Sequence, residues 1–296
     1  MLAIDIGGTK VAVAVVTATG DVVEERRFST PHGPALAAVD EILGWASELA
    51  ARHSVVACGI VLPAVIEEGR IAWAAASIAG WDGVPLRDRA GERLGVPVVA
   101  EFDGYGATLG EWWQGSARGY DDAAVVVGTG VGAGLIHAGR LYRGTSAVAG
   151  GIGWFRFPRG ATQGPRLEDL ASGPAILARA RRLHGGDGAV YPDTRAVFAA
   201  AEAGDLAAHR AVERGWRALA AGVGAIVALL APEIVVLGGS VGARPDTVAR
   251  VRELVKISTQ PFAAQTVKVE GSSLGPLSSL YGAAYLAHQL DQGKEP

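Results

Sequence analysis

The chain contains little cysteine, few aromatic residues and few charged residues. Its single cysteine, Cys58, excludes an internal disulfide, and its apolar neighbours predict a buried, unreactive thiol. Aromatic residues make up 6% and charged residues 19% of the 296 positions, whereas hydrophobic residues reach 49%. This composition argues against a disordered chain and favours a globular protein in a reducing compartment, the cytoplasm.

The chain also lacks a large excess of charge of either sign and a continuous membrane-spanning run. Its 27 basic and 30 acidic residues give a net charge of −3, so no basic field favours nucleic acid or a membrane surface. The longest apolar run, residues 218–239, is divided by Pro232 and Glu233, which indicates a helix, a turn and a buried strand. No basic segment or cleavage site precedes the first expected strand. We therefore expect no nucleic-acid partner and no membrane association.

Short apolar runs and helical periods alternate along the chain. Three β-rich runs, residues 2–6, 11–16 and 22–28, are separated by glycine-containing turns, and residues 124–143 repeat this plan. Helical periodicity follows each group of strands. The alternation predicts an α/β protein with two lobes of related topology, each built on a central sheet.

The length of 296 residues suits two lobes around a cleft. We expect a small lobe at residues 1–110 and a large lobe at residues 111–280, with a final helix at 281–296 that packs back on the small lobe. Residues 155–166 are rich in Pro, Gly and Arg and are the clearest surface loop.

Two glycine-threonine turns, each between apolar strands, carry the main functional signal. Glycine lets backbone N–H groups approach anionic oxygens without a clashing Cβ, so two such turns favour binding of a polyphosphate. Lys10 either offsets phosphate charge or is simply solvated. The candidate phosphate-binding residues are Gly7, Gly8, Thr9, Lys10, Gly128, Thr129, Gly130 and Gly132.

The second turn also satisfies a relaxed dinucleotide fingerprint, Gly-x-Gly-x-x-Ala, from Gly128 to Ala133. The residues after it continue as a strand instead of opening a helix, and no acidic residue lies about 20 positions further on to bind a ribose. The first turn likewise lacks the upstream glycine of a Walker loop. The pattern therefore argues against NAD binding.

Two aspartates end predicted strands beside these turns. Asp5 immediately precedes the first turn, where its carboxylate either holds Mg²⁺ near the phosphates or caps the turn. Asp103 lies between a strand and a helix, so it is either a helix N-cap or a group aimed into the cleft. Phosphoryl transfer to a hydroxyl needs a carboxylate that accepts the proton.

Seven segments resemble the ROK family, which belongs to the superfamily of sugar kinases, heat-shock protein 70 and actin. The resemblance implies a two-lobed, actin-like ATPase fold with ribonuclease H-like lobes, and dimers are common in the family. The segments follow the family order and are residues 5–10, 80–86, 101–111, 128–134, 139–144, 167–173 and 236–241.

The resemblance implies a role for several residues. The two glycine turns would bind the phosphates of ATP, Asp5 would hold Mg²⁺, and Gly238 with Gly239 would lie under the adenosine. Asp103 matches the general base that deprotonates a sugar hydroxyl, usually the primary one at carbon six. Glu168 matches a glutamate that binds ring hydroxyls. ATP and Mg²⁺ are the expected cofactors and a sugar-like molecule is the expected substrate.

The sugar-binding side departs from the family pattern. Phe102 stands where the family usually has asparagine, and Gly151 and Trp154 stand where it usually has glutamate and histidine. Ser77 also stands where asparagine is common. The loss of about three polar contacts of about 1.5–3 kcal/mol each would weaken glucose binding by about three to six decades. The aromatic replacements suit a modified hexose, an aminohexose or a C7 cyclitol.

The zinc site that is common in the family requires the same histidine and three cysteines in the following loop. Residues 155–166 contain neither residue type, so we predict no structural zinc.

Three other interpretations remain open. The chain could be a non-catalytic sugar or nucleotide sensor, a glucokinase, or an N-acetylhexosamine kinase. A repressor of the family carries a helix-turn-helix before the first turn, whereas only four residues precede Asp5 here. An actin-like filament or a chaperone would need long insertions.

Overall fold

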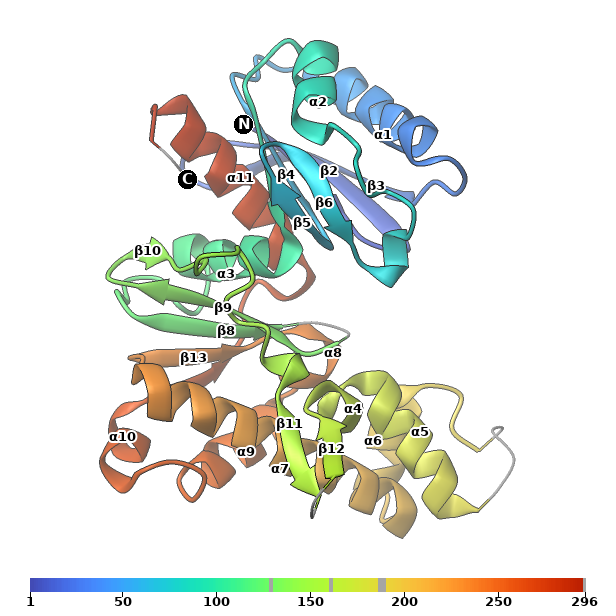
Figure 1. Ribbon diagram of the computed structural model, residues 1–296, viewed down its shortest axis with the longest axis vertical. Coiled ribbons are helices and arrows are strands. Elements are labelled where there is room, and N and C mark those ends of the chain that lie inside the picture. Colours follow the sequence, from blue (N-terminus) through green and yellow to red (C-terminus); the bar gives the residue numbers. More distant parts are fainter. Residues whose placement is uncertain (128–129, 160–161, 186–189, 295–296) are drawn as a thin grey trace. The chain divides into compact units, whose positions relative to one another are not determined.

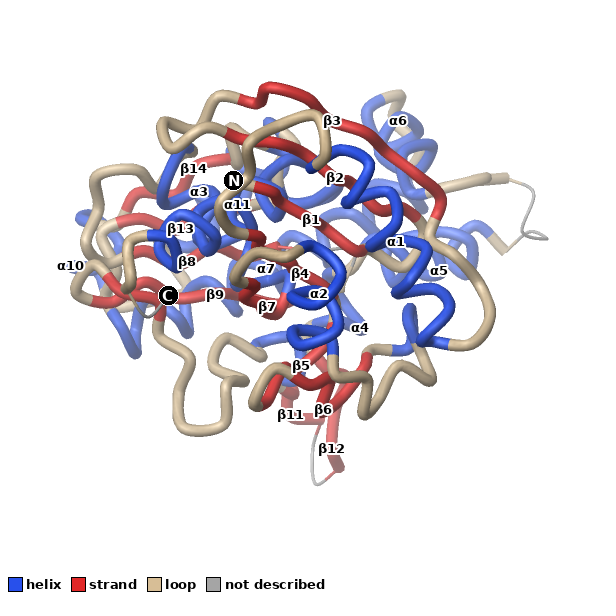
Figure 2. The backbone as a smooth tube through the Cα atoms, turned by 90° about the horizontal axis from the view of Figure 1, so that it is seen from above, coloured by secondary structure: helices blue, strands red, loops and turns tan. Residues whose placement is uncertain are grey.

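A computed structural model of the chain describes residues 1–127, 130–159, 162–185 and 190–294 (Figures 1 and 2). The chain forms two compact units. Unit 1 comprises Met1–Gly119, Leu141–Val148 and Pro276–Pro296, and unit 2 comprises Tyr120–Arg140 and Ala149–Gly275. The lobe boundaries expected from the sequence, 1–110 and 111–280, stay a prediction.

Unit 1 is built on a five-stranded sheet of order β3-β2-β1-β4-β7. Strands β1, β2 and β3 form an antiparallel meander, whereas β1, β4 and β7 are parallel. The carboxyl ends of the three parallel strands therefore meet at one edge of the sheet. The strands are β1 (Leu2–Ile6), β2 (Lys10–Val16), β3 (Val22–Ser29), β4 (Cys58–Leu62) and β7 (Val98–Phe102).

Helices cover both faces of this sheet (Figure 1). Side chains that alternate along β1 and β4 form a core with α1, and the buried Cys58 belongs to that core. The thiol is buried, as the sequence predicted, and burial raises its pKa. The remaining elements are α1 (Ala35–Ala50), β5 (Ala64–Glu67), β6 (Arg70–Ala74), η1 (Ala76–Ile78), α2 (Leu86–Leu94), α3 (Asp103–Gln114) and α11 (Ser278–Asp291).

The final helix, α11, packs against α3, β1 and β4. Glycines make this packing unusually close. A Cβ on Gly59 would overlap the Ala283 carbonyl, and a Cβ on Gly282 would overlap the Gly106 carbonyl. The backbones of these elements are therefore in direct contact, and no larger residue fits between them.

Unit 2 repeats the plan with a sheet of order β10-β9-β8-β13-β14. Strands β8 and β9 are antiparallel, and β8, β13 and β14 are parallel. The recurrence confirms the related topology predicted from the sequence. The strands are β8 (Ala123–Val127), β9 (Gly132–His137), β10 (Arg140–Leu141), β13 (Ile234–Leu237) and β14 (Lys268–Gly271).

Helices α7 and α9 pack with β13 in the core of unit 2. Arg156–Arg159 and Thr162–Arg166 form two antiparallel strands, β11 and β12, so the expectation of a loop was wrong for these residues. The elements are η2 (Ile152–Trp154), β11 (Arg156–Arg159), β12 (Thr162–Arg166), α4 (Glu168–Ala171), α5 (Gly173–His184), α6 (Thr194–Glu202), α7 (Leu206–Leu230), α8 (Gly239–Gly242), α9 (Pro245–Val255), α10 (Pro261–Thr266) and η3 (Gly275–Leu277).

The long apolar run is divided as the sequence predicted. Helix α7 ends at Leu230 and strand β13 begins at Ile234. Within the described residues, no helix combines the length and the apolar character that crossing a bilayer requires.

The close packing of α11 gives a test of the fold. Gly282→Ala is expected to lower the free energy of unfolding by about 1–3 kcal/mol, because the new methyl group meets backbone that cannot move aside. Gly44→Ala is the matched control in α1, where a Cβ would meet nothing within 4 Å. It is expected to raise stability by about 0.5–1 kcal/mol through helix propensity. Urea unfolding measures both changes, and equal effects would contradict the packing argument.

Candidate active site

The first glycine turn joins β1 to β2 and is held in a fixed shape. The Gly7 N–H donates to the Lys10 carbonyl at 2.8 Å. Thr30, which directly follows β3, stabilises the turn with two hydrogen bonds. Its hydroxyl donates to the Gly7 carbonyl at 2.7 Å, and its N–H donates to the Thr9 carbonyl at 3.1 Å. The turn is thus preorganised, which lowers the cost of binding an anion there.

Gly8 makes the closest approach of this turn to another segment. A Cβ on Gly8 would lie 2.5 Å from the Ser77 Cβ, so only glycine lets the turn lie against η1. The structure thereby brings Ser77, expected on the sugar side, beside the expected phosphate turn. Lys10, the first residue of β2, is exposed and makes no ion pair within the described residues.

Asp5 and Asp103 lie at the same edge of the unit 1 sheet. Asp5 is near the end of β1, and Asp103 directly follows β7. Burial and, to a smaller extent, the nearby charge of Asp103 raise the pKa of Asp5 to about 7, and Arg27 opposes the shift. Burial also raises the pKa of Asp103 to about 6, against the lowering effect of backbone N–H groups at its own position and at Gly104. The two carboxylates therefore interact electrostatically.

Asp103 is the first residue of α3, and Phe102 occupies the N-cap position without a side-chain cap. Asp103 is therefore not the N-cap residue, although its carboxylate interacts with the backbone N–H groups at the start of α3. The Phe102 ring packs over the start of the helix, where a Cβ on Gly104 would lie 2.5 Å from it, and meets the Tyr105 ring edge-on at 5.5 Å between centroids. An aromatic surface thus flanks the carboxylate.

A partly buried ion pair near Asp103 in the sequence was not predicted. Arg143 Nε donates to Glu101 Oε2 at 2.7 Å, and the Phe102 N–H donates to Glu101 Oε1 at 2.9 Å. The Glu101 side chain is only 11% exposed. A charged residue inside a strand is a signal that a partner is required, but the sequence does not say which arginine supplies it. The pair fixes the end of β7 and neutralises a carboxylate near Asp103.

In unit 2, the second glycine turn contacts Glu168. The Val131 N–H donates to Glu168 Oε2 at 3.1 Å, and Gly130 lies so close to this oxygen that a Cβ would overlap it. The other oxygen, Oε1, lies 3.8 Å from Arg166. Glu168 therefore links the second turn to β12, a role that the sequence did not reveal. Gly128 and Thr129 lie outside the described residues.

Gly130 and Gly238 line one small hollow at the carboxyl ends of β8 and β13. The Gly238 N–H donates to the Val126 carbonyl at 2.8 Å, and Gly239 has a φ of 74°, a left-handed conformation that favours glycine. At Gly132, a Cβ would meet nothing within 4 Å. The hollow is lined by Val126, Gly130, Val131, Ala171, Leu219, Leu237, Gly238, Val241 and Gly242.

Gly151 immediately precedes η2 and Trp154 is the last residue of η2, which lies beside Glu168. A Cβ on Gly153 would overlap the Val131 carbonyl and lie 3.6 Å from the Glu168 Cβ. Trp154 is 69% exposed, and the Arg166 guanidinium lies 4.8 Å from its ring centroid. These residues thus present an open aromatic face next to the candidate sugar-binding glutamate.

Comparison with known proteins identifies the class. The two sheets of related topology, with glycine turns at their parallel edges, are those of the two-lobed, actin-like fold found in sugar kinases. The model of the ROK family matches residues 1–290. The chain belongs to the ROK family.

Three relatives act on different sugars. A kanosamine kinase of Amycolatopsis mediterranei is 33% identical, with 100% of this chain and 98% of the relative covered. An N-acetylmannosamine kinase of Yersinia pestis is 34% identical, with 84% of this chain and 86% of the relative covered. A ROK family glucokinase from Streptomyces griseus, whose crystal structure is in complex with glucose and AMPPNP, has 30% sequence identity to this chain. The two structures superpose with a TM-score of 0.81, and the match covers 98% of this chain and 99% of the glucokinase. These similar identities do not distinguish among the three sugars.

The two carboxylates predict an unusual pH dependence of stability. An aspartate in an unfolded chain has a pKa of about 3.9, so these two carboxyl groups bind more protons in the folded chain than in the unfolded chain up to about pH 7. The resulting stabilisation is fully present below about pH 4 and is lost as the pH rises through about 6 and 7. Asp5→Asn should reduce the loss between pH 5 and pH 8 by about 2 kcal/mol.

Urea unfolding across this pH range measures the effect. Asp88→Asn, at an exposed position on α2, is the control and should reproduce the wild-type profile. Identical profiles for Asp5→Asn and the wild type would contradict the coupling of the two carboxylates.

Proposed function

We propose that this chain is a carbohydrate kinase that transfers the γ-phosphate of ATP to a hydroxyl, of the primary C6 kind, on a sugar-like acceptor other than plain glucose. The observation that carries the proposal is the placement of Asp103 and Asp5 at one sheet edge beside a braced glycine turn. Membership of the ROK family supports the same chemistry.

Asp103 is the proposed general base. With a pKa of about 6, its carboxylate is mostly ionised at pH 7 and is a stronger base than an ordinary aspartate. It accepts the proton of the acceptor hydroxyl as that oxygen forms a bond to the γ-phosphorus and the bond to the β-phosphate oxygen breaks. The products are a phosphate ester and ADP, and the proton remains on Asp103 until it passes to solvent.

Asp5 is the proposed magnesium-binding residue. Its carboxylate carries a raised pKa, caused by burial and by the charge of Asp103, and a cation beside it would relieve both effects. Mg²⁺ binds through one or two carboxylates together with phosphate oxygens and waters, so these residues fit the ion. When bound, the ion would neutralise charge on the phosphates.

Glycine residues in both units are proposed to contribute to ATP binding. The first turn, Gly7 to Lys10, offers backbone N–H groups next to Asp5, and the braces from Thr30 keep it in shape. In unit 2, Gly130 and Gly238 present backbone without side chains beside a small hollow, and the nucleoside is proposed to lie against this glycine backbone. The glucokinase complex with AMPPNP supports ATP as the phosphate donor.

The acceptor is proposed to be a less hydroxylated or substituted sugar. Phe102, directly before Asp103 in the chain, contributes an aromatic ring, and Arg143 forms an ion pair with the carboxylate of Glu101. Trp154 adds an exposed ring beside Glu168. These features favour stacking on a ring face over hydrogen bonding to many hydroxyls. The homodimer and the cytoplasmic location expected from the sequence stay predictions.

The role of Asp103 is tested with Asp103→Asn. The change removes the proton acceptor but keeps the size of the side chain, so turnover should fall by about 10²–10⁴-fold. The measurement is ADP release with Mg-ATP across hexoses, aminohexoses, N-acetylhexosamines and cyclitols. Asp88→Asn is the exposed control and should keep wild-type turnover. Full turnover by Asp103→Asn would refute the assignment, and a wild type that turns over none of these acceptors would favour the sensor interpretation.

The role of Phe102 is tested with Phe102→Asn, which restores the amide usual in the family. The new hydrogen bonds should raise kcat/KM for glucose by about three- to tenfold relative to the best acceptor of the panel. Phe262→Asn replaces a phenylalanine that is 73% exposed on α10 and should leave the ratio unchanged. An unchanged ratio for Phe102→Asn would show that this ring does not select the acceptor.

A further inference from the structure

Helices α5 and α7 of unit 2 carry a local excess of positive charge. Together they contain six arginines and a single acidic residue, Glu213. The arginines are Arg179, Arg181, Arg182, Arg210, Arg214 and Arg217. This concentration of positive charge on two packed helices contrasts with the net charge of −3 of the whole chain.

Two of these arginines have partners among the residues that the structure describes. Arg181 donates to the Tyr191 carbonyl at 3.0 and 2.6 Å. Arg217 lies 2.8 Å from Glu213, which also pairs with Arg250 at 2.7 Å. The only acid on the two helices is therefore shared by two other arginines, and it leaves no charge for Arg179 and Arg214.

Arg179 is the least satisfied of the group. Its Nε is buried and has no hydrogen-bond partner in the part of the chain that the structure describes. Burial and the neighbouring charges of Arg214 and Arg182 lower the pKa of its guanidinium. A buried donor without an acceptor is costly, and a cluster of like charges adds to that cost. An anion at this place would relieve both.

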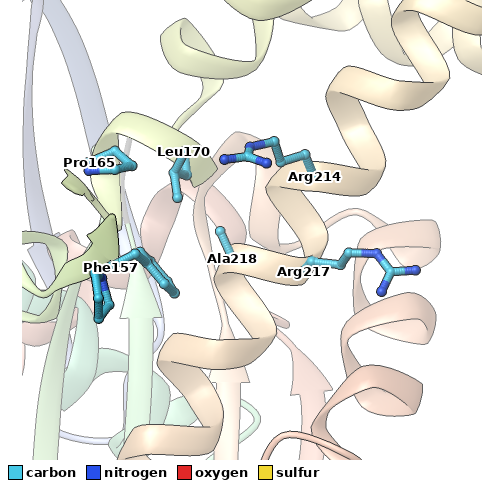
Figure 3. Close-up of a pocket in the computed structure, with 7 residues that line it drawn as sticks. Phe157, Pro165, Leu170, Arg214, Arg217 and Ala218 are labelled. Atoms are coloured by element: carbon cyan, nitrogen blue, oxygen red, sulfur yellow. The ribbon is translucent and has the colours of Figure 1, made fainter. Parts of the chain in front are cut away.

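A cavity of about 440 Å³ adjoins Arg214. Its volume falls within the range of small-molecule sites, about 300–1,000 Å³. Figure 3 shows the Arg214 guanidinium pointing toward Leu170 and Pro165, whereas Arg217 points away from them. The cavity is lined by Phe157, Pro158, Pro165, Leu170, Arg214, Arg217 and Ala218.

We propose that this cavity binds a small organic anion, an apolar body that bears a phosphate monoester. The body would lie against strands β11 and β12 and against Leu170, and the phosphate would face Arg214, with the positive charge of Arg179 near Arg214 adding to the attraction. Phosphate suits this position because a guanidinium donates paired, charge-assisted hydrogen bonds to it. The cavity shares no lining residue with the hollow at Gly130 and Gly238, so the two sites are separate.

The test is calorimetric titration of the whole chain with phenyl phosphate, with and without saturating Mg-AMPPNP. Arg214→Gln should weaken binding at least about tenfold, because it removes a charge-assisted contact. Arg179→Gln should weaken it in the same direction. Arg210→Gln is the matched control on the same helix, and it should change the dissociation constant by less than about twofold, since Arg210 is exposed and does not line the cavity.

Two further probes separate the parts of the ligand. Phenol lacks the charge and inorganic phosphate lacks the apolar body, so each should bind at least about tenfold more weakly than phenyl phosphate. Thermal melts of all variants check that folding is kept. The proposal is overturned if phenyl phosphate does not bind at millimolar concentration, if Arg214→Gln binds it as well as wild type, or if Mg-AMPPNP displaces it.

Discussion

The close approach of two carboxylates at one sheet edge is the constraint on which the rest of the structure depends. Burial raises the pKa of Asp5 and Asp103, and the charge of Asp103 raises that of Asp5 further. Near neutral pH such a pair costs stability, so the surrounding structure has to hold it in place. Thr30 braces the turn after Asp5, and the ion pair of Glu101 with Arg143 fixes the strand before Asp103. The repulsion that destabilises the folded chain also makes the edge a favourable place for a cation.

In each unit, glycine allows the elements around the candidate site residues to pack backbone against backbone. In unit 1, α11 lies directly on α3 through Gly282, which supports the helix that begins at Asp103. In unit 2, a Cβ on Gly150 would overlap the Ala133 carbonyl, and Gly153 is equally close to Val131. These contacts position Glu168 against the second turn. These closely packed glycines thus provide rigidity where direct backbone contact replaces side-chain packing.

Charge is distributed unevenly although the net charge is small. Unit 1 concentrates carboxylates beside the first glycine turn, whereas α5 and α7 of unit 2 concentrate arginines. Both groups are partly buried and incompletely paired, and this is costly unless a ligand of opposite charge binds. The first group fits a metal cation with phosphates, and the second fits an organic phosphate. The same electrostatic reasoning therefore supports two ligands of opposite charge.

The sequence by itself determined the features that depend on neighbouring residues. The strands of the two meanders, the glycine turns and the division of residues 218–239 follow from local periodicity and turn chemistry, and family motifs drew attention to Asp5, Asp103 and Glu168. The tertiary structure alone decided which distant groups meet. Arg143 pairs with Glu101, 42 positions away, Glu168 contacts Val131, and Arg179 is left beside Arg214 on another helix. No local pattern encodes these contacts, because each depends on how separate elements pack, and packing is set by the whole chain at once.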